Sequence, residues 1–402
     1  HHPPPLPSSA TKFFEQQQQW ADFAGAMKLT HARVKLPPKW VLPLVFLLNT
    51  PGLVSGYFGM TLSQHQRRDF LQTTLLTGAG FSTRRPGRNQ MDNVVPPQML
   101  HSVPGNLKVI DSHLHVWSNG QSPFPYAAGQ EPPEQMQSNC GAEDLLERMS
   151  EARVSGSLIV QPINHKFDHS YVKSVIDQHP NKFKGMCLAN PSLSPDEAVA
   201  NIQDLHGQGF VGIRFNPYLW PDNGKMSNEA GSMMFAKAAE LGMPVGIMCF
   251  KGLDLHFDDI KTLLEGTPET KVILDHFGFF MQQAKDIESD DKIFAQLLEL
   301  SNYPQVYVKT SAYFRNSRGG NGWPYADLAP RLEALLEHYG SERLLWGSDY
   351  PFVKNECGYK ESLAALFKWR EESTDLQDKL TDSDLENIFY GTATKLFGSW
   401  GG

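Results

Sequence analysis

The segment IDSHLHVWS, residues 110–118, places two histidines one residue apart just after a short apolar run. Because side chains alternate between the two faces of a β-strand, His113 and His115 are expected on one face, together with Asp111. Imidazoles on a shared face can ligate a divalent metal or donate hydrogen bonds to a reacting carbonyl group. Solvated histidines at a polar strand end are the alternative, and this pair alone does not decide between them.

Further groups with catalytic or binding potential follow other apolar runs. His276 comes after Asp275 in ILDHFGF, and Asp349 lies in LLWGSDYPF. The remaining polar residues in such positions are Arg214, Asn216, Lys309, Ser311, Gln161 and Asn164. If these runs are strands whose carboxyl ends converge, three histidines, a carboxylate and two cations share one site. Such a set is hard to attribute to chance, so it favours a functional site over isolated polar residues.

The apolar runs themselves indicate how the candidate residues are positioned. After a first gap of fifty residues, the runs begin about 25–40 residues apart, the length of one βα unit. The eight runs are 107–111, 157–161, 183–189, 210–215, 243–250, 271–275, 305–309 and 343–347. Strands that are apolar on both faces and alternate with helices indicate a parallel sheet. Eight of them predict a closed (β/α)8 TIM barrel over residues 106–402, with an open doubly wound sheet as the alternative.

Helical segments lie between the predicted strands. Segment 194–209 begins with Ser194, Pro195 and Glu197, the signature of a capping box, and it ends on a glycine. Segments 227–242 and 325–340 also end on glycine. We expect segment 383–397 to form a final helix packed on the outside of the barrel.

One interval is longer than a βα unit requires. Segment 116–140, which follows the first strand, is rich in proline, aromatic and polar residues. Because active sites of such barrels lie at the carboxyl ends of the strands, this segment is predicted to form a wall or lid over the pocket. An ordinary surface insertion is the alternative. Trp117 in this segment is a candidate substrate-binding residue.

Three motifs together resemble one known superfamily. D-x-H-x-H at 111–115, D-H-x-G at 275–278 and W-G-S-D-Y-P at 346–351 resemble the amidohydrolases. The resemblance is strongest to the amidohydrolase-related branch of pyrone-dicarboxylate lactonase and sugar lactonases, and in detail to uncharacterised plant and algal members. It covers about residues 107–397 and implies a (β/α)8 barrel. It implies that His113 and His115 are metal ligands, that Asp349 is both ligand and general base, and that His276 orients water or polarises the carbonyl.

Two departures from the superfamily pattern affect the cofactor. Arg214 stands where binuclear relatives carry a carboxylated lysine, which disfavours a bridged two-metal site. The fifth strand has no histidine and offers only Met248 and Cys249, and a thioether is a poor zinc ligand. His113, His115 and Asp349 still make a three-ligand set with an open position for water. One divalent metal, with zinc as the candidate, and a metal-free site therefore both remain open.

The residues indicate hydrolysis of a small anionic lactone or cyclic amide. Asp349 is expected to act as base for water, and His276 to act on the carbonyl group. Arg214 suits a substrate carboxylate, with Lys309 as a second cation, although either could instead form an ion pair within the barrel. Gln161 and Asn216 complete the predicted substrate-binding set. A metal-dependent decarboxylase of a small unsaturated or aromatic acid, and a barrel that binds without catalysis, are the alternatives.

Residues 1–105 differ from the rest of the chain and are predicted to be a disordered or cleavable targeting-like extension. They contain ten Lys and Arg against four Asp and Glu, and the segment after Met60 is rich in Arg, Ser and Thr. This composition favours import into a chloroplast or other organelle, with a cytoplasmic location as the alternative. Prolines and glycines interrupt the apolar segment 40–62, so no stable membrane span is expected.

The charge of the remaining chain excludes one class of partner. The whole sequence carries a net charge of −8, and residues 106–402 are more acidic still. An acidic body without a basic helix repels phosphates, so nucleic acid is not an expected partner. The four cysteines are far apart and form no zinc-binding pattern, and no pattern specifies an oligomeric state.

Overall fold

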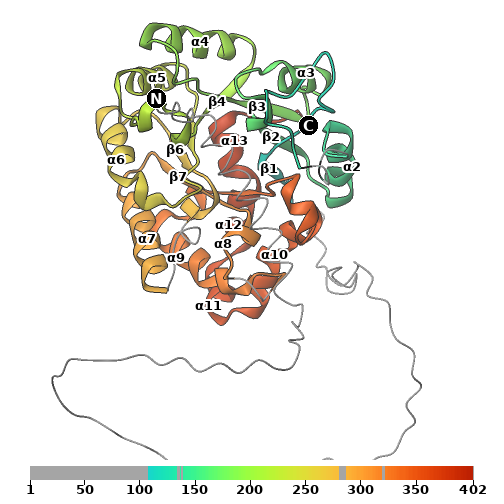
Figure 1. Cartoon of the computed structure of the whole chain (residues 1–402). Helices are drawn as coiled ribbons and strands as arrows, with labels where there is room; N and C mark the ends of the chain where they lie inside the picture. Colours follow the sequence, from blue (N-terminus) through green and yellow to red (C-terminus); the bar gives the residue numbers. More distant parts are fainter. Residues whose placement is uncertain (1–106, 134–135, 137–138, 280–286, 319–321, 402) are drawn as a thin grey trace, which may run out of the picture. The chain divides into compact units, whose positions relative to one another are not determined.

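The computed structural model describes residues 107–133, 136, 139–279, 287–318 and 322–401. Eight parallel strands follow one another around a barrel in chain order, as predicted (Figure 1). They are β1 (Ile110–Leu114), β2 (Gly156–Val160), β3 (Phe183–Leu188), β4 (Phe210–Phe215), β5 (Val245–Ile247), β6 (Val272–Leu274), β7 (Val306–Ser311) and β8 (Leu344–Gly347). The predicted extension 1–105, with its apolar segment 40–62, lies outside the described residues.

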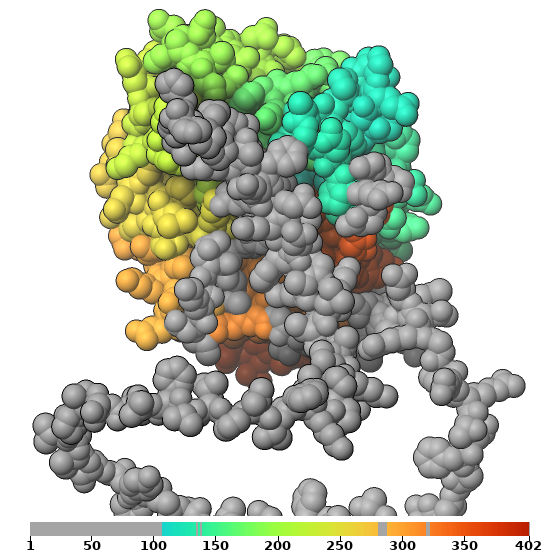
Figure 2. Space-filling model, in the orientation of Figure 1, coloured from blue at the N-terminus to red at the C-terminus, as the bar shows by residue number. Residues whose placement is uncertain are grey.

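The first and last strands meet and complete the barrel. Leu114 forms a parallel bridge with Tyr350, and the His115 amide donates to the Tyr350 carbonyl at 2.7 Å. In the space-filling view, successive parts of the chain follow one another around the visible face from cyan through green and yellow to orange (Figure 2). The predicted TIM barrel is therefore confirmed, and the open doubly wound sheet is excluded.

Helices surround the strands and cover their outer faces (Figure 1). The helices that follow the strands are α2 (Ala142–Ala152), α3 (Ser170–Gln178), α4 (Pro195–Gly207), α5 (Glu229–Glu240), α6 (Phe257–Gly266), α7 (Ile287–Glu299), α8 (Tyr313–Asn316), α9 (Ala329–Tyr339) and α10 (Tyr359–Glu372). The predicted capping box of α4 is present, because the Ser194 amide and hydroxyl both donate to the Glu197 carboxylate. Gly242 and Gly340 follow α5 and α9 with φ of 65° and 70°, a conformation that glycine adopts without strain.

The carboxyl-terminal segment corrects one prediction. The segment 383–397 forms three pieces, α12 (Asp382–Glu386), a π-helical turn (Asn387–Gly391) and α13 (Thr392–Phe397), preceded by α11 (Thr374–Lys379). Leu396, Phe397 and Trp400 do not pack outside the barrel but against inward-facing strand residues such as Ile110 and Met186. They cover the end of the barrel opposite the carboxyl ends of the strands, because its apolar interior must be shielded from water.

Glycine makes this closure possible at β2. A Cβ atom on Gly156 would lie 2.3 Å from the Trp400 ring, so a larger residue there would displace the tryptophan. Polar residues occupy the opposite end of the barrel.

None of the helices within the described residues has both the length and the apolar character that a membrane crossing requires.

Candidate active site

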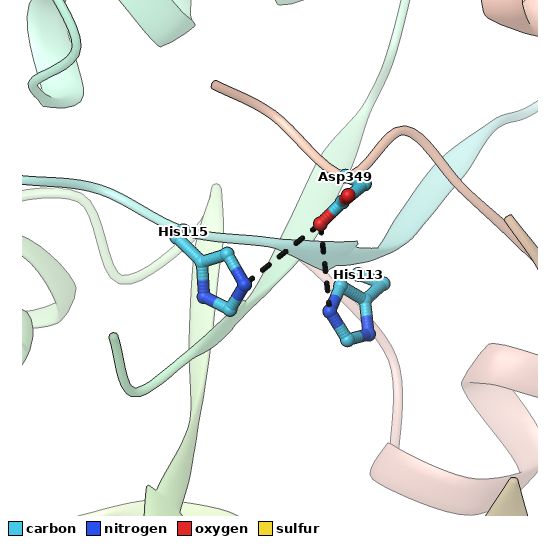
Figure 3. A group of neighbouring side chains, drawn as sticks. All are labelled: His113, His115 and Asp349. Carbon is cyan, nitrogen blue, oxygen red and sulfur yellow. Dashed lines mark ion pairs between the residues drawn. The ribbon is translucent and has the colours of Figure 1, made fainter. Parts of the chain in front are cut away.

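Two imidazoles and one carboxylate converge at the carboxyl end of the barrel. Nε2 of His113 lies 4.0 Å from Oδ1 of Asp349, and Nε2 of His115 lies 3.9 Å from the same oxygen (Figure 3). All three side chains are buried, and their potential ligand atoms lie within 4.8 Å of one another. These separations exceed hydrogen-bond length, so the three side chains surround a common point but form no hydrogen bonds with one another there.

Backbone contacts between β1 and β8 fix these ligands. The Asp349 amide donates to the His113 carbonyl at 2.9 Å. The Asp111 carboxylate accepts from the amides of His113 and Ser348 at 3.1 and 3.0 Å. Asp111 thus joins the two strand ends and does not belong to the ligand group. Strand alternation had placed it with His113 and His115, but the β1–β2 register shifts between Asp111 and Leu114. Burial raises the pKa of Asp111 to about 6.

His276 brings a third imidazole to the same oxygen. Its Nε2 lies 3.8 Å from Oδ1 of Asp349, and its ring is 4.3 Å from that of His113. His276 and Asp349 both adopt positive φ, 53° and 60°, in the turns directly after β6 and β8. Strained backbone of this kind persists where the surrounding structure holds it, and it aims both side chains inward.

Each imidazole is anchored through its other nitrogen. Nδ1 of His115 lies 2.8 Å from the Val160 carbonyl oxygen, and Nδ1 of His276 lies 2.7 Å from the Ser311 hydroxyl. Nδ1 of His113 contacts Asp275 and Lys309, at 3.2 and 3.1 Å. Because Nδ1 is held at the periphery, all three Nε2 atoms face the Asp349 carboxylate.

The donor set fits a divalent metal. Burial lowers the pKa of His113 to about 4 and the pKa values of His115 and His276 well below their usual value. The imidazoles are therefore neutral near pH 7, the form in which they ligate metals. Nε2 of His113 is also buried without a hydrogen-bond partner among the described residues, a deficit that an ion at this point would remove.

Arg315 is a site residue that the sequence analysis missed. It lies on α8, four residues after β7 ends, and its Nε donates to Oδ2 of Asp349 at 2.8 Å. Its guanidinium group also stacks 4.6 Å from the ring centroid of Phe352. Asp349 thus has one oxygen bound by Arg315 and the other facing the imidazoles. The position of Arg315, a cation shortly after the seventh predicted strand, was the signal in the sequence that could have identified it as a site residue.

The two predicted cations, Arg214 and Lys309, lie on either side of Asp275. Lys309 is fully buried with Nζ 3.2 Å from Oδ1 of Asp275, and a guanidinium nitrogen of Arg214 lies 3.4 Å from Oδ2. Burial alone would raise the pKa of Asp275, but Lys309 and His113 hold it well below its usual value. Both cations therefore take the ion-pair alternative in this structure. Arg214 also contacts the Met248 sulfur and keeps a buried Nε without a partner among the described residues, so its substrate role stays a prediction.

The other predicted substrate-binding residues are buried near the strand ends and make structural contacts. The Gln161 amide donates to the carbonyls of Lys166 and Asp168, and the Asn216 side chain accepts from the Tyr218 amide. Their roles toward a substrate stay predictions.

Trp117 lies at the edge of the site. Its ring is 5.5 Å from that of Phe352, whose ring lies 6.2 Å from His115. The long segment after β1 thus packs against Phe352, which borders the site, and within this segment Trp117 also packs with Met136 and Cys140. Its substrate role likewise stays a prediction.

The fold and the site together define a hydrolase of the amidohydrolase class. The chain belongs to the amidohydrolase family, whose model matches residues 110–399. The predicted resemblance to the amidohydrolases is therefore confirmed, while the more detailed resemblance to plant and algal members stays a prediction.

Individual relatives with similar sequences are lactone hydrolases. The chain is 28% identical over 248 residues to a 4-sulfomuconolactone hydrolase of Rhizobium radiobacter, covering 60% of this chain and 75% of that one. It is 27% identical over 258 residues to a 2-pyrone-4,6-dicarboxylate hydrolase of Comamonas testosteroni, covering 60% and 76%. An L-fucono-1,5-lactonase of Burkholderia ambifaria is 23% identical, covering 66% and 88%. The chain is thus a lactonase-like hydrolase.

Solved structures share the fold. A candidate 2-pyrone-4,6-dicarboxylic acid hydrolase from Pseudomonas putida superposes with a TM-score of 0.58 at 23% identity, covering 73% of this chain and 98% of that one. An amidohydrolase from Burkholderia multivorans, solved with bound zinc, gives a TM-score of 0.57 at 17% identity, covering 73% and 99%. At these identities the superpositions establish the barrel and no more.

Proposed function

We propose that the protein hydrolyses a small anionic lactone at the carboxyl end of its barrel, with one divalent metal, zinc in the first instance, held by His113, His115 and Asp349. One observation carries the proposal: a single carboxylate oxygen of Asp349 is faced by three imidazole nitrogens at 3.8–4.0 Å. The lactone hydrolases among the relatives, and the zinc bound by an amidohydrolase of the same fold, support it.

The side chains divide the reaction between them. Asp349 accepts a proton from water as the water oxygen bonds to the ring carbonyl carbon. His276 donates a hydrogen bond to the carbonyl oxygen as negative charge develops there. The ring C–O bond then breaks, and the proton held by Asp349 passes to the departing ring oxygen. A bound metal would supply acidified water and polarise the carbonyl.

Arg214 supports an anionic substrate. Its guanidinium group is buried, and its Nε has no partner among the described residues. A buried donor without an acceptor is costly, and a substrate carboxylate or sulfonate would remove that cost with a charge-assisted hydrogen bond. The named substrates of two relatives, a sulfomuconolactone and a pyrone-dicarboxylate, carry such groups.

Two measurements test the proposal. Elemental analysis of the purified full chain should give about one divalent ion per chain, and the ion should be lost in His113→Asn. A panel of lactones with and without anionic groups, followed by proton release, should show turnover of the anionic members. Carbon dioxide release from a matched panel of carboxylic acids would instead favour the decarboxylase. A site that binds panel members without turning any over would favour a binding protein.

A further inference from the structure

Three buried groups form a closed triangle behind His113. Nδ1 of His113 is 3.1 Å from Nζ of Lys309 and 3.2 Å from Oδ1 of Asp275, while Nζ and Oδ1 are 3.2 Å from each other. All three side chains are fully buried. The triangle therefore brings a cationic donor and an anionic acceptor to the same imidazole nitrogen.

That nitrogen can serve only one of the two partners at a time. A neutral imidazole carries its single proton on either Nδ1 or Nε2. With the proton on Nδ1, the ring donates to Asp275 and Nε2 presents a lone pair. With the proton on Nε2, Nδ1 accepts from Lys309 and Nε2 becomes a donor. The choice of tautomer thus determines whether Nε2 can ligate a metal.

The surrounding charges favour the second state when no metal is bound. The Lys309 ammonium group next to Nδ1 opposes an N–H there, and Oδ1 of Asp349, 4.0 Å from Nε2, favours an N–H at Nε2. Only Asp275 favours the opposite tautomer, and its two oxygens already face Lys309 and Arg214. One hydrogen bond, from Lys309 to Nδ1, and one nearby charge, on Asp349, therefore favour the Nε2–H tautomer, while Asp275 alone of these neighbours opposes it.

We propose that Lys309 is a positioning residue that holds His113 in the Nε2–H tautomer in the metal-free protein, so that metal binding must move the ring proton to Nδ1, whose N–H then donates a hydrogen bond to Asp275. Lys309 then opposes metal binding and Asp275 promotes it. This inference deepens the proposed function and rests on its metal site. The same pair of residues allows Nε2 to donate a hydrogen bond to a carbonyl oxygen whenever the ion is absent.

Nitrogen NMR tests the tautomer without any activity assay. The metal-stripped full chain, labelled with ¹⁵N in its histidines, should show His113 protonated at Nε2, with the signal assigned by its loss in His113→Asn. In Lys309→Met the proton should move to Nδ1. Arg214→Met is the matched control, because it removes a cation that also faces Asp275 but does not contact His113. In this variant the His113 tautomer should be the same as in the wild type.

Zinc affinity, measured by competition with a chromogenic chelator, gives the second readout. Changes around a ligating histidine typically alter metal affinity by about 10–100-fold. We expect Lys309→Met to bind zinc about tenfold more tightly than both wild type and Arg214→Met, and Asp275→Asn to bind it about tenfold more weakly. Tighter binding in Lys309→Met and Arg214→Met alike would indicate a general charge effect and overturn the proposal.

The remaining outcomes are also decisive. A wild-type spectrum with the His113 proton on Nδ1 overturns the proposal even if Lys309→Met does not fold. Absence of lactone turnover would count against the proposed function but would leave the tautomer result standing. Unchanged zinc affinity in both Lys309→Met and Asp275→Asn would overturn the inference alone.

Discussion

Arg315→Met should slow turnover by disturbing the Asp349 carboxylate. Arg315 Nε donates to Oδ2 of Asp349 at 2.8 Å, and this contact fixes the plane of the carboxylate whose other oxygen faces the imidazoles. Loss of the contact leaves Asp349, which is 2% exposed, free to rotate away from the position that accepts a proton from water. The fold should persist because the Arg315 side chain is a quarter exposed.

The size of the effect follows from the type of contact. A hydrogen bond between charged groups contributes about 1.5–3 kcal/mol, and about 1.4 kcal/mol corresponds to a factor of ten in rate. We therefore expect kcat to fall about 10- to 150-fold. Solvent around the partly exposed guanidinium group places the expected value toward the lower end of that range. Because the contact positions a catalytic group, the loss should appear in kcat more than in KM.

The assay is steady-state lactone hydrolysis followed by proton release in weak buffer, with thermal unfolding as the check on folding. Arg315→Lys should lie between wild type and Arg315→Met, because lysine keeps the charge but lacks the planar donor pair. Arg318→Met is the matched control, since Arg318 lies three residues after Arg315 but pairs with Asp290 on α7 and does not contact Asp349. Wild-type kcat in Arg315→Met, or an equal fall in Arg318→Met, would refute the reasoning.

Three further predictions use the same assays. Asp349→Asn should abolish turnover while the protein stays folded, because the amide cannot accept the proton from water; a kcat close to that of the wild type would remove Asp349 from the role of base. Arg214→Met should raise KM for an anionic lactone far more than for a neutral analogue, and equal increases would argue against a carboxylate contact. Phe397→Ala should lower the free energy of unfolding in urea by about 3–5 kcal/mol, because this ring is 5% exposed at the closed end of the barrel. Leu255→Ala, at a side chain 59% exposed, is its control and should change stability by less than about 0.5 kcal/mol.

The eight strands could be predicted because the burial of each strand determines the residue types within its own short segment of the sequence. A strand buried on both faces needs a continuous apolar run, and the run 210–215 matches β4 (Phe210–Phe215) residue for residue. The helix that starts at Pro195 was equally visible, since its capping box depends on neighbours in the chain alone. His113, His115, His276 and Asp349 follow from the same logic, because they directly follow or end predicted strands that converge.

Other features depend on contacts between distant segments. Nothing local indicates that Phe397 and Trp400 close the barrel interior, because that requires Gly156 to leave space more than two hundred residues earlier. The role of Asp111 depends on the Ser348 amide, which only closure of the barrel brings within reach. Strand alternation misplaced this side chain because the register shifts within β1.

The sequence by itself thus determined the barrel and the residue types at its carboxyl end, because burial and strand alternation produce patterns that are visible within short segments of the chain. Tertiary structure alone decided which charged groups pair with one another. Lys309 forms an ion pair with Asp275 and a hydrogen bond with His113, and Arg315, which lies beyond the strand, forms an ion pair with Asp349. Such pairings follow from distances between side chains on different strands, and sequence spacing carries no information about them.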